Sequence, residues 1–180
     1  MKLNIGTHTG THMDAPAHFM KNGKTIDNID LKNCMGKAVV VHLPDLKPYY
    51  EIVPEDFNSL EEHIKNSSIV LFNTGWIYKV GTEEFYKHPY ISKSSAEYLK
   101  NLGVKAVGVD MLNVDKTCVE GEQYTENSTS AHNVFLGNDI LIVENLINLE
   151  KLNTTGSNVM FLPLKIKDGD GSPVRAVAFV

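Results

Sequence analysis

The stretch HTGTHMDAPAH, from His8 to His18, carries three histidines and one aspartate within eleven residues. His8, His12, Asp14 and His18 follow one another at offsets of four, two and four residues. Imidazole nitrogens and carboxylate oxygens are ligands that bind first-row divalent metal ions in proteins. Four such groups in one short segment predict a metal site.

The backbone of this segment is expected to be extended and bent. Gly10, Pro16 and the neighbouring threonines disfavour a helix, which argues against an H-E-x-x-H helix of the zincin type. Every interval between the four side chains is even, so an extended segment directs all of them to one face. A straight strand would separate its ends by about 30 Å, whereas the ligands of one site must converge. We therefore expect the chain to bend at Gly10 and Pro16.

An isolated histidine is more often a surface or hydrogen-bonded residue than a ligand. His42, His63 and His88 are interpreted in that way. The same interpretation is open for the His8–His18 segment, but four groups on one face favour ligation.

The composition is that of one ordinary globular domain. The 180 residues include 42% hydrophobic and 22% charged residues, which allows a buried core without disulfides and argues against disorder. We expect a single domain over residues 1–180. The formal charge of −5 offers no basic surface for nucleic acid or an anionic membrane, which leaves a small molecule as the expected partner.

Two features indicate a cytoplasmic protein. Cys34 and Cys118 are isolated, so neither a disulfide framework nor a thiolate zinc site is expected. The start MKLNIGTH has no targeting pattern, and no run approaches the roughly 18 apolar residues that a membrane span needs.

Short β-branched and apolar runs alternate with helical patterns along the chain. Strands are expected at Ala38–Leu43, Ile69–Phe72, Val104–Val109, Ile140–Val143, Val159–Ile166 and Val174–Val180. Helices are expected at Pro54–Asn66, from the N-cap Ser94 to the glycine stop Gly103, and at Ser130–Leu136, with a turn at Asp168–Gly171. This alternation predicts an α/β domain and leaves the strand order open.

The His8–His18 segment resembles the H-x-G-T-H-x-D-x-P-x-H signature of the cyclase family of metal-dependent hydrolases, which includes bacterial kynurenine formamidases and isatin hydrolases. The match holds at every fixed position. Further similarity lies in LFNTGW, GVDMLNVD, HNVFLGNDILIVENLINLEKL and LPLKIKDGDGSPVRAVA, so the resemblance spans nearly the whole chain. It implies a swivelling β/β/α domain with a mixed central sheet.

The resemblance also implies a site for one or two metal ions, commonly zinc or manganese. By motif position, His8, His12 and Asp14 would bind the first ion. Asp14 would share the second ion with His132 and with Glu144 as a bridging carboxylate. The sequence agrees in one respect, because His132 opens an expected short helix and Glu144 ends an expected strand. Taken alone, each of these two residues is more often structural, but beside the His8–His18 cluster ligation is favoured.

A metal ion lowers the pKa of bound water from about 15.7 toward about 7 and polarises a substrate carbonyl, so metal-bound water would be the nucleophile. The chain has no G-x-S-x-G elbow that would supply an activated serine. His18 is the candidate catalytic residue, since an unperturbed pKa of about 6.5 suits proton transfer and the family assigns its counterpart this role. It would deliver a proton to the departing nitrogen.

These expectations combine into a hydrolase of amide C–N bonds. Its most specific form is an arylformamidase that converts N-formyl-L-kynurenine to L-kynurenine and formate. The alternatives are hydrolysis of another amide, lactam or lactone, as in isatin hydrolase, and a non-catalytic metal-binding protein.

The sequence says less about the substrate. Related enzymes commonly have a serine in the segment corresponding to Asp110–Asn113, and this chain has no hydroxyl there. Trp76, Phe72 and Tyr78 are candidates for an aromatic pocket, although a lone tryptophan after a strand is more often a core residue. Arg175 is a candidate for a contact to a substrate carboxylate, with a structural ion pair as the alternative.

Family members usually carry some tens of residues before the histidine motif, including a strand and an aromatic residue near the substrate. This chain begins almost at the motif, so we expect an abbreviated or truncated start and an incomplete pocket. A missing first strand would leave an exposed sheet edge, and we expect a homodimer or homotetramer to cover it.

Overall fold

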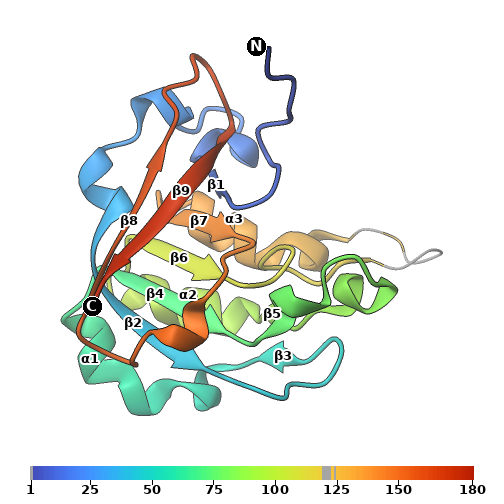
Figure 1. Ribbon diagram of the computed structural model, residues 1–180, viewed down its shortest axis with the longest axis vertical. Coiled ribbons are helices and arrows are strands. Elements are labelled where there is room, and N and C mark those ends of the chain that lie inside the picture. Colours follow the sequence, from blue (N-terminus) through green and yellow to red (C-terminus); the bar gives the residue numbers. More distant parts are fainter. Residues whose placement is uncertain (1, 119–122, 124) are drawn as a thin grey trace.

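The structure is a computed structural model that describes residues 2–118, 123 and 125–180. Within these residues the main sheet follows the strand order β1-β7-β6-β4-β2-β8-β9, and β1 also pairs with β9, which closes the sheet into a barrel (Figure 1). The strands of this sheet are β1 (His12–Asp14), β2 (Met35–His42), β4 (Ile69–Asn73), β6 (Ala106–Val109), β7 (Leu141–Glu144), β8 (Ser157–Pro163) and β9 (Gly171–Phe179). A separate two-stranded sheet contains β3 (Glu51–Ile52) and β5 (Tyr90–Ile91).

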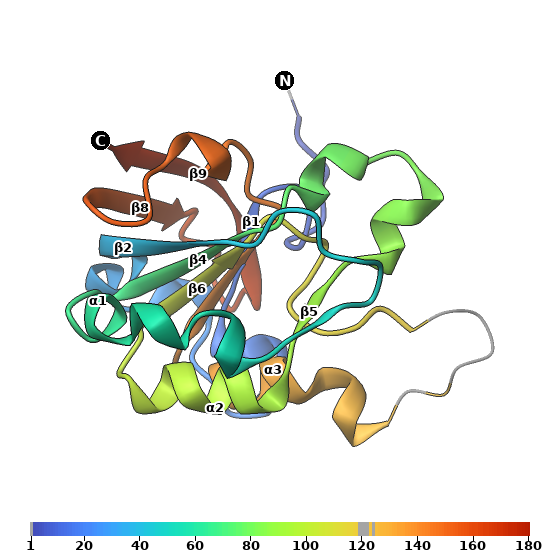
Figure 2. The same ribbon diagram turned by 90° about the horizontal axis from the view of Figure 1, so that it is seen from below.

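The main sheet is mixed. The neighbours β2, β4, β6 and β7 are parallel, whereas β1, β8 and β9 form antiparallel pairs. Parallel neighbours need crossover connections, and these contain α1 (Glu61–Lys65), α2 (Lys93–Asn101) and α3 (Ser130–Leu136). Figure 2 shows the three helices along one side of the sheet and the β8–β9 hairpin on the other. The predicted α/β class with a mixed central sheet is confirmed.

The parallel strands are continuous apolar runs because both of their faces are buried. In β2, Val39 and Val41 pack in the cluster that contains the helix residues. Ala38 and Val40 of the same strand pack in a second cluster inside the barrel. Met13 of β1 belongs to this inner cluster and is fully buried. Met13, which lies between His12 and Asp14, therefore anchors β1 in the core.

The predicted helix at Pro54–Asn66 is mostly wrong. This segment forms two short 3₁₀ helices, Pro54–Asp56 and Asn58–Leu60, before α1 begins. Phe57 lies between them with φ −145°, outside helical geometry, and its side chain is buried. The interruption turns this ring into the core, where it contacts Phe72 with ring centroids 5.4 Å apart.

The other two helices lie where the sequence predicts them, with one change of cap. The hydroxyl of Ser92, rather than that of Ser94, accepts a hydrogen bond from the Ser95 backbone N–H at 3.0 Å and caps α2. Helix α3 has the predicted bounds, Ser130–Leu136, and Gly137 is its C-cap. In the described part of the chain, no helix is long and apolar enough to cross a membrane.

The expected exposed sheet edge is not at β1, which pairs with β7 on one side and with β9 on the other. Among the described residues, β9 beyond Val174 pairs only with β8. Val177 and Phe179 are exposed on this part of the strand. The free edge therefore lies at the end of β9.

Candidate metal centre

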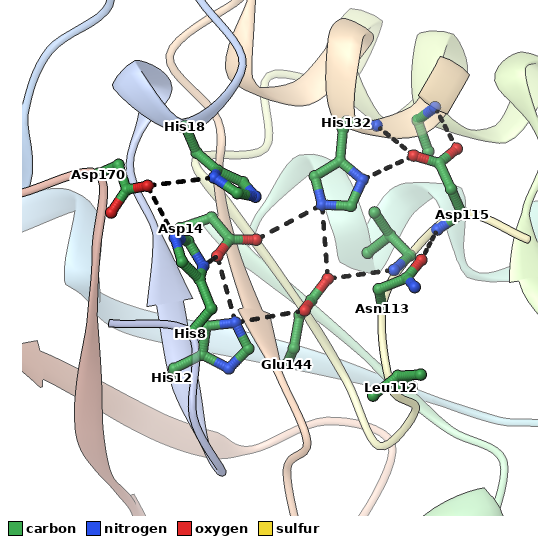
Figure 3. A network of polar contacts seen from close by, with 12 residues as sticks. His8, His12, Asp14, His18, Leu112, Asn113, Asp115, His132, Glu144 and Asp170 are labelled. Atoms are coloured by element: carbon green, nitrogen blue, oxygen red, sulfur yellow. Dashed lines mark hydrogen bonds and ion pairs between the residues drawn. The ribbon is translucent and has the colours of Figure 1, made fainter. Parts of the chain in front are cut away.

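Six side chains that the sequence singles out converge in the structure (Figure 3). They are His8 in the loop before β1, His12 and Asp14 on β1, His18 in the 3₁₀ helix Pro16–His18, His132 on α3 and Glu144 at the end of β7. The first four come from one short segment, and the last two arrive from distant parts of the chain.

The local backbone explains this convergence. Gly10 has φ +64°, a left-handed conformation that favours glycine and turns the chain between His8 and His12. His12 and Asp14 are two residues apart on β1 and therefore face the same side. The antiparallel register places His12 directly opposite Glu144 on β7, so the two side chains form a cross-strand pair.

Asp14 lies at the centre of the cluster. Its Oδ1 atom is 2.7 Å from His8 Nδ1 and 3.3 Å from His12 Nε2. Its Oδ2 atom is 3.5 Å from His132 Nε2. The Asp14 carboxylate therefore contacts three imidazoles, from the loop before β1, from β1 and from α3.

Glu144 completes the arrangement from the opposite strand. Its Oε2 atom is 3.4 Å from His12 Nε2, and its Oε1 atom is 3.6 Å from His132 Nε2. The Val114 backbone N–H donates to Oε1 at 3.2 Å and holds the carboxylate in place. The two carboxylates thus share His12 and His132 between them, as expected of groups that hold one or two cations.

Each imidazole of the centre has a second nitrogen that faces away from Asp14 and Glu144. His132 Nδ1 lies 2.6 Å from Asp115 Oδ2, and His12 Nδ1 lies 2.8 Å from the carbonyl oxygen of Gly10. A metal-binding histidine characteristically directs its other ring nitrogen to a carboxylate or a carbonyl, which fixes the tautomer. His12 and His132 therefore have the orientation of ligands, with Nε2 available to a cation.

Burial and charge oppose each other at the two carboxylates. Burial raises the pKa of Asp14, but hydrogen bonds from His12, His132 and His8 outweigh it and hold that pKa well below its usual range. Burial, followed by the negative charge of Asp14, raises the pKa of Glu144 well above its usual range. Burial lowers the pKa of His132, but its hydrogen bonds to Asp115 and Asp14 prevail and raise it to about 10.

These shifts indicate that the buried negative charge needs a positive counterpart. Protons on the imidazoles supply it in part, and a divalent cation would supply it fully. Two triads, His8–Asp14–His18 and His12–Asp14–Glu144, have ligand atoms that all lie within 4.8 Å of one another. The donor set of nitrogen and oxygen atoms fits a divalent first-row ion.

His18 lies at the margin of the centre. Its ring stacks on His8 with centroids 3.9 Å apart, and its Nδ1 atom is 3.5 Å from Asp170 Oδ2. The side chain is 29% exposed, against 8% for His132, so it is the more accessible group. Burial lowers the pKa of His18. The geometry also groups His18 with His8 and Asp14 as a possible ligand.

Three neighbours of the centre were missed by the sequence reasoning. Asp115 accepts hydrogen bonds from the Ala131 and His132 backbone N–H groups at 2.8 and 3.0 Å, besides contacting the imidazole. Asp170 contacts His8 and His18, and Phe19 stacks on His132 with centroids 4.5 Å apart. The available signals were the GVDMLNVD and DGDG stretches and the aromatic residue next to His18.

Other residues considered for the substrate lie elsewhere. Phe72 and Trp76 are buried in the core, and the Trp76 indole N–H donates to the Phe85 carbonyl at 3.1 Å. Tyr78 is exposed. Trp76 therefore has the core position that the sequence favours, with its indole turned inward by the 3₁₀ helix after β4, and the alternative of an aromatic pocket is not supported.

The structure also places two polar residues from the substrate discussion, Arg175 and Asp110. Arg175 is exposed and lines a cavity of about 570 Å³ whose lining includes none of the six converging residues. The carboxylate of Asp110 accepts hydrogen bonds from the backbone N–H groups of Thr74 and Gly75 and from the Thr74 hydroxyl. Asp110 therefore fixes the turn after β4.

The isolated histidines lie outside the centre, as predicted. His42 Nδ1 lies 2.8 Å from the Asn73 amide nitrogen, and His88 contacts the Pro89 carbonyl and the Thr117 hydroxyl. His63 is exposed on α1.

Comparisons with known proteins agree with this arrangement. A family model named Cyclase matches residues 1–116. A kynurenine formamidase of Geobacillus thermodenitrificans is 32% identical over 175 residues, covering 97% of this chain and 77% of the relative. A kynurenine formamidase of Bacillus cereus is 31% identical over 177 residues, covering 98% and 78%.

Solved structures show the same fold. An isatin hydrolase bound to the product analogue thioisatinate has a TM-score of 0.87 and 26% identity, covering 98% of this chain and 73% of that chain. Isatin hydrolase A from Ralstonia solanacearum has a TM-score of 0.83 and 27% identity with the same coverage. With its histidine motif, its fold and these relatives, the chain belongs to the cyclase family of metal-dependent hydrolases.

Proposed function

We propose that this protein hydrolyses amide C–N bonds and that it is, in the most specific form, an arylformamidase that releases formate from N-formylkynurenine. The observation that carries the proposal is the convergence of four imidazoles and two carboxylates at one largely buried centre. The kynurenine formamidases among its relatives support the choice of an aryl formamide.

In this proposal His8, His12 and Asp14 hold a first metal ion. Asp14, His132 and Glu144 hold a second ion where two are bound. The donors suit zinc, with manganese as the alternative, because they are nitrogen and oxygen atoms without a thiolate. When bound, such an ion lowers the pKa of water and polarises a carbonyl oxygen.

His18 is the residue that moves protons. It is the most exposed of the four imidazoles, at 29% against 26% for His8, and burial lowers its pKa, which favours the neutral ring that can accept a proton from water. The hydroxide part of the water adds to the formyl carbon, and the C–N bond then breaks. His18 returns the proton to the departing nitrogen, which gives an amine and formic acid that ionises to formate.

A second candidate substrate class is a cyclic amide or lactone. The similarity to two isatin hydrolase structures favours this class, because the same centre would open a ring instead of releasing formate. Ring opening and formamide cleavage need the same two events, namely addition of water to a carbonyl carbon and protonation of the leaving atom.

A substrate panel with metal control tests the reaction. The protein is depleted of metal with a chelator, reloaded with Zn²⁺ or Mn²⁺, and assayed on aryl formamides, lactams and lactones. We expect formamide turnover that disappears on chelation and returns on reloading. Turnover of lactams or lactones alone would favour the second class. Bound metal without any turnover would instead identify a non-catalytic metal-binding protein.

His18→Ala separates proton transfer from metal binding. We expect the variant to retain metal by elemental analysis and to lose about 100-fold or more in kcat, the usual contribution of a positioned acid–base group. His63→Ala, on the exposed face of α1, is the matched control and should leave both unchanged. Loss of metal in His18→Ala would make His18 a ligand, and an unchanged kcat would refute its role.

We also propose a single-domain cytoplasmic protein that forms a homodimer or homotetramer. The free cysteines Cys34 and Cys118 agree with a reducing compartment. The exposed end of β9 supports association, since a free strand edge tends to be covered. A monomeric mass by light scattering at micromolar concentration would contradict the oligomer.

A further inference from the structure

Asp170 lies immediately before β9 and faces two imidazoles at once (Figure 3). Its Oδ2 atom is 3.2 Å from His8 Nε2 and 3.5 Å from His18 Nδ1. The two rings are stacked, with an angle of 28° between their planes. One carboxylate oxygen, which has two lone pairs, is therefore placed between a candidate metal ligand and the candidate proton-transfer residue.

The carboxylate is held in this position by contacts of its own residue. The Thr7 hydroxyl donates to Asp170 Oδ1 at 3.0 Å, which leaves Oδ2 directed to the imidazoles. The Asp170 carbonyl accepts a hydrogen bond from the Ala15 N–H at 2.9 Å, next to the 3₁₀ helix that carries His18. Asp170 is therefore anchored to the same segment as the histidines that it contacts.

The ring orientations give this contact a chemical meaning. His8 directs Nδ1 to Asp14 and Nε2 to Asp170. His8 Nε2 is buried, and among the described residues it has no hydrogen-bond partner of good geometry. A buried imidazole nitrogen that carries a proton needs an acceptor, and Asp170 Oδ2 is the carboxylate oxygen placed beside it, 3.2 Å away.

We propose that Asp170 is a positioning residue that keeps the proton of His8 on Nε2 and that of His18 on Nδ1, so that His8 Nδ1 faces the metal and His18 Nε2 faces the substrate. This inference rests on the proposed function for the role of His18 only. The role at His8 concerns metal binding and stands without any turnover. A carboxylate suits both contacts because its negative charge strengthens the hydrogen bonds that Oδ2 accepts from the two imidazole N–H groups.

The test compares Asp170→Asn and Asp170→Ala with Asp168→Asn. Asp168 lies in the same turn, is exposed and has φ +56°, a conformation that asparagine tolerates, so the control removes the same charge without touching a histidine. Thermal denaturation checks that all variants fold. Zinc affinity is measured by competition with a chelator, and the tautomer of His18 is read from ¹⁵N–¹H NMR of the zinc-loaded protein.

We expect both Asp170 variants to bind zinc about 10- to 100-fold more weakly, the usual effect of removing a residue that orients a metal-binding histidine. The NMR signals of His18 should move from the Nδ1–H tautomer toward a mixture of the two tautomers. At saturating zinc, kcat should fall while KM changes little, because His18 loses its orientation. Asp168→Asn should match the wild type in all three measurements.

The outcomes separate this inference from the proposed function. A zinc affinity and a His18 tautomer that are equal in Asp170→Ala and in Asp168→Asn would overturn the role of Asp170, whatever the turnover. A wild type without turnover on the whole panel, but with weaker zinc binding in the Asp170 variants, would refute the hydrolase and leave the His8 contact standing. An unchanged kcat at saturating zinc would refute the contact to His18.

Discussion

Gly171 shows how closely the backbone approaches the histidine rings. A Cβ atom at this position would lie 2.6 Å from His8 Cε1 and 2.9 Å from the Met13 carbonyl oxygen. That carbonyl belongs to β1, so it cannot move away without disturbing the pairing of β1 with β9. A side chain here would displace the His8 ring or separate the two strands.

Gly171→Ala should therefore weaken zinc binding. We expect a loss of about tenfold or more in affinity by chelator competition, comparable to the loss of an orienting contact. Gly6→Ala is the control, because its nearest neighbour is the Thr9 hydroxyl at 3.2 Å, on a side chain that can rotate away. Equal zinc affinity in both variants would show that His8 does not need this close approach.

The sequence locates the candidate ligands better than the residues that support them. His8, His12 and Asp14 could be proposed because they share one short segment with even spacing. The roles of Asp115 and Asp170 depend on which loops meet the histidines in space, and neither residue has a distinctive local pattern. Supporting residues of this kind become visible only when the tertiary contacts are known.

Helix α2 illustrates how a local pattern can misplace a boundary. Ser92 and Ser94 both lie at the start of the helical pattern, and only Ser94 has a glutamate three residues later. In the structure the cap is Ser92, which lies directly after β5. The capped residue Ser95 also donates a hydrogen bond from its hydroxyl to the Ile52 carbonyl on β3 at 2.8 Å. The contact between α2 and β3 selects the earlier cap.

Ser92→Ala should destabilise the protein by about 1 kcal/mol in urea denaturation, since it removes the side-chain acceptor for the Ser95 N–H. Ser94→Ala should have a smaller effect, because Ser94 is exposed and only its hydroxyl contact to Ser92 is lost. The reverse order of the two effects would contradict the observed cap.

Strands could be located more reliably than the short helices. Val39–Val41 and Val70–Phe72 are buried on both faces, so their apolar runs have no polar residue to blur the pattern. Phe57 instead interrupts a run with helical spacing, because burial of its ring needs a backbone turn that the spacing does not reveal. Strand order also had to come from the structure, since β1 pairs with β7 and β9 from the far end of the chain.

At the scale of the whole molecule, the candidate metal centre joins the beginning of the sequence to segments from its second half. His8 and His12 come from the beginning, while His132 and Glu144 come from α3 and β7. An ion bound only by the folded chain stabilises that state by mass action. Metal removal should therefore lower thermal stability as well as activity.

We expect zinc at about 100 times its dissociation constant to add about 2.7 kcal/mol of stability, which corresponds to a rise in Tm of roughly 5–10 °C for a chain of this size. Calorimetry with zinc and with excess chelator measures the difference. The variant His12→Ala lacks the candidate ligand that contacts both Asp14 and Glu144. Its Tm should rise little or not at all when zinc is added. Identical Tm values for the wild type under both conditions would argue against binding at this centre.

Strand β1 has only three residues, and two of them, His12 and Asp14, belong to the centre while the same strand closes the barrel. Replacing either residue would leave polar partners of the centre, such as Glu144, buried without it, at a cost in stability. A lesion in this short strand should therefore loosen the seam of the barrel together with the polar cluster, so that the two failures arrive as one.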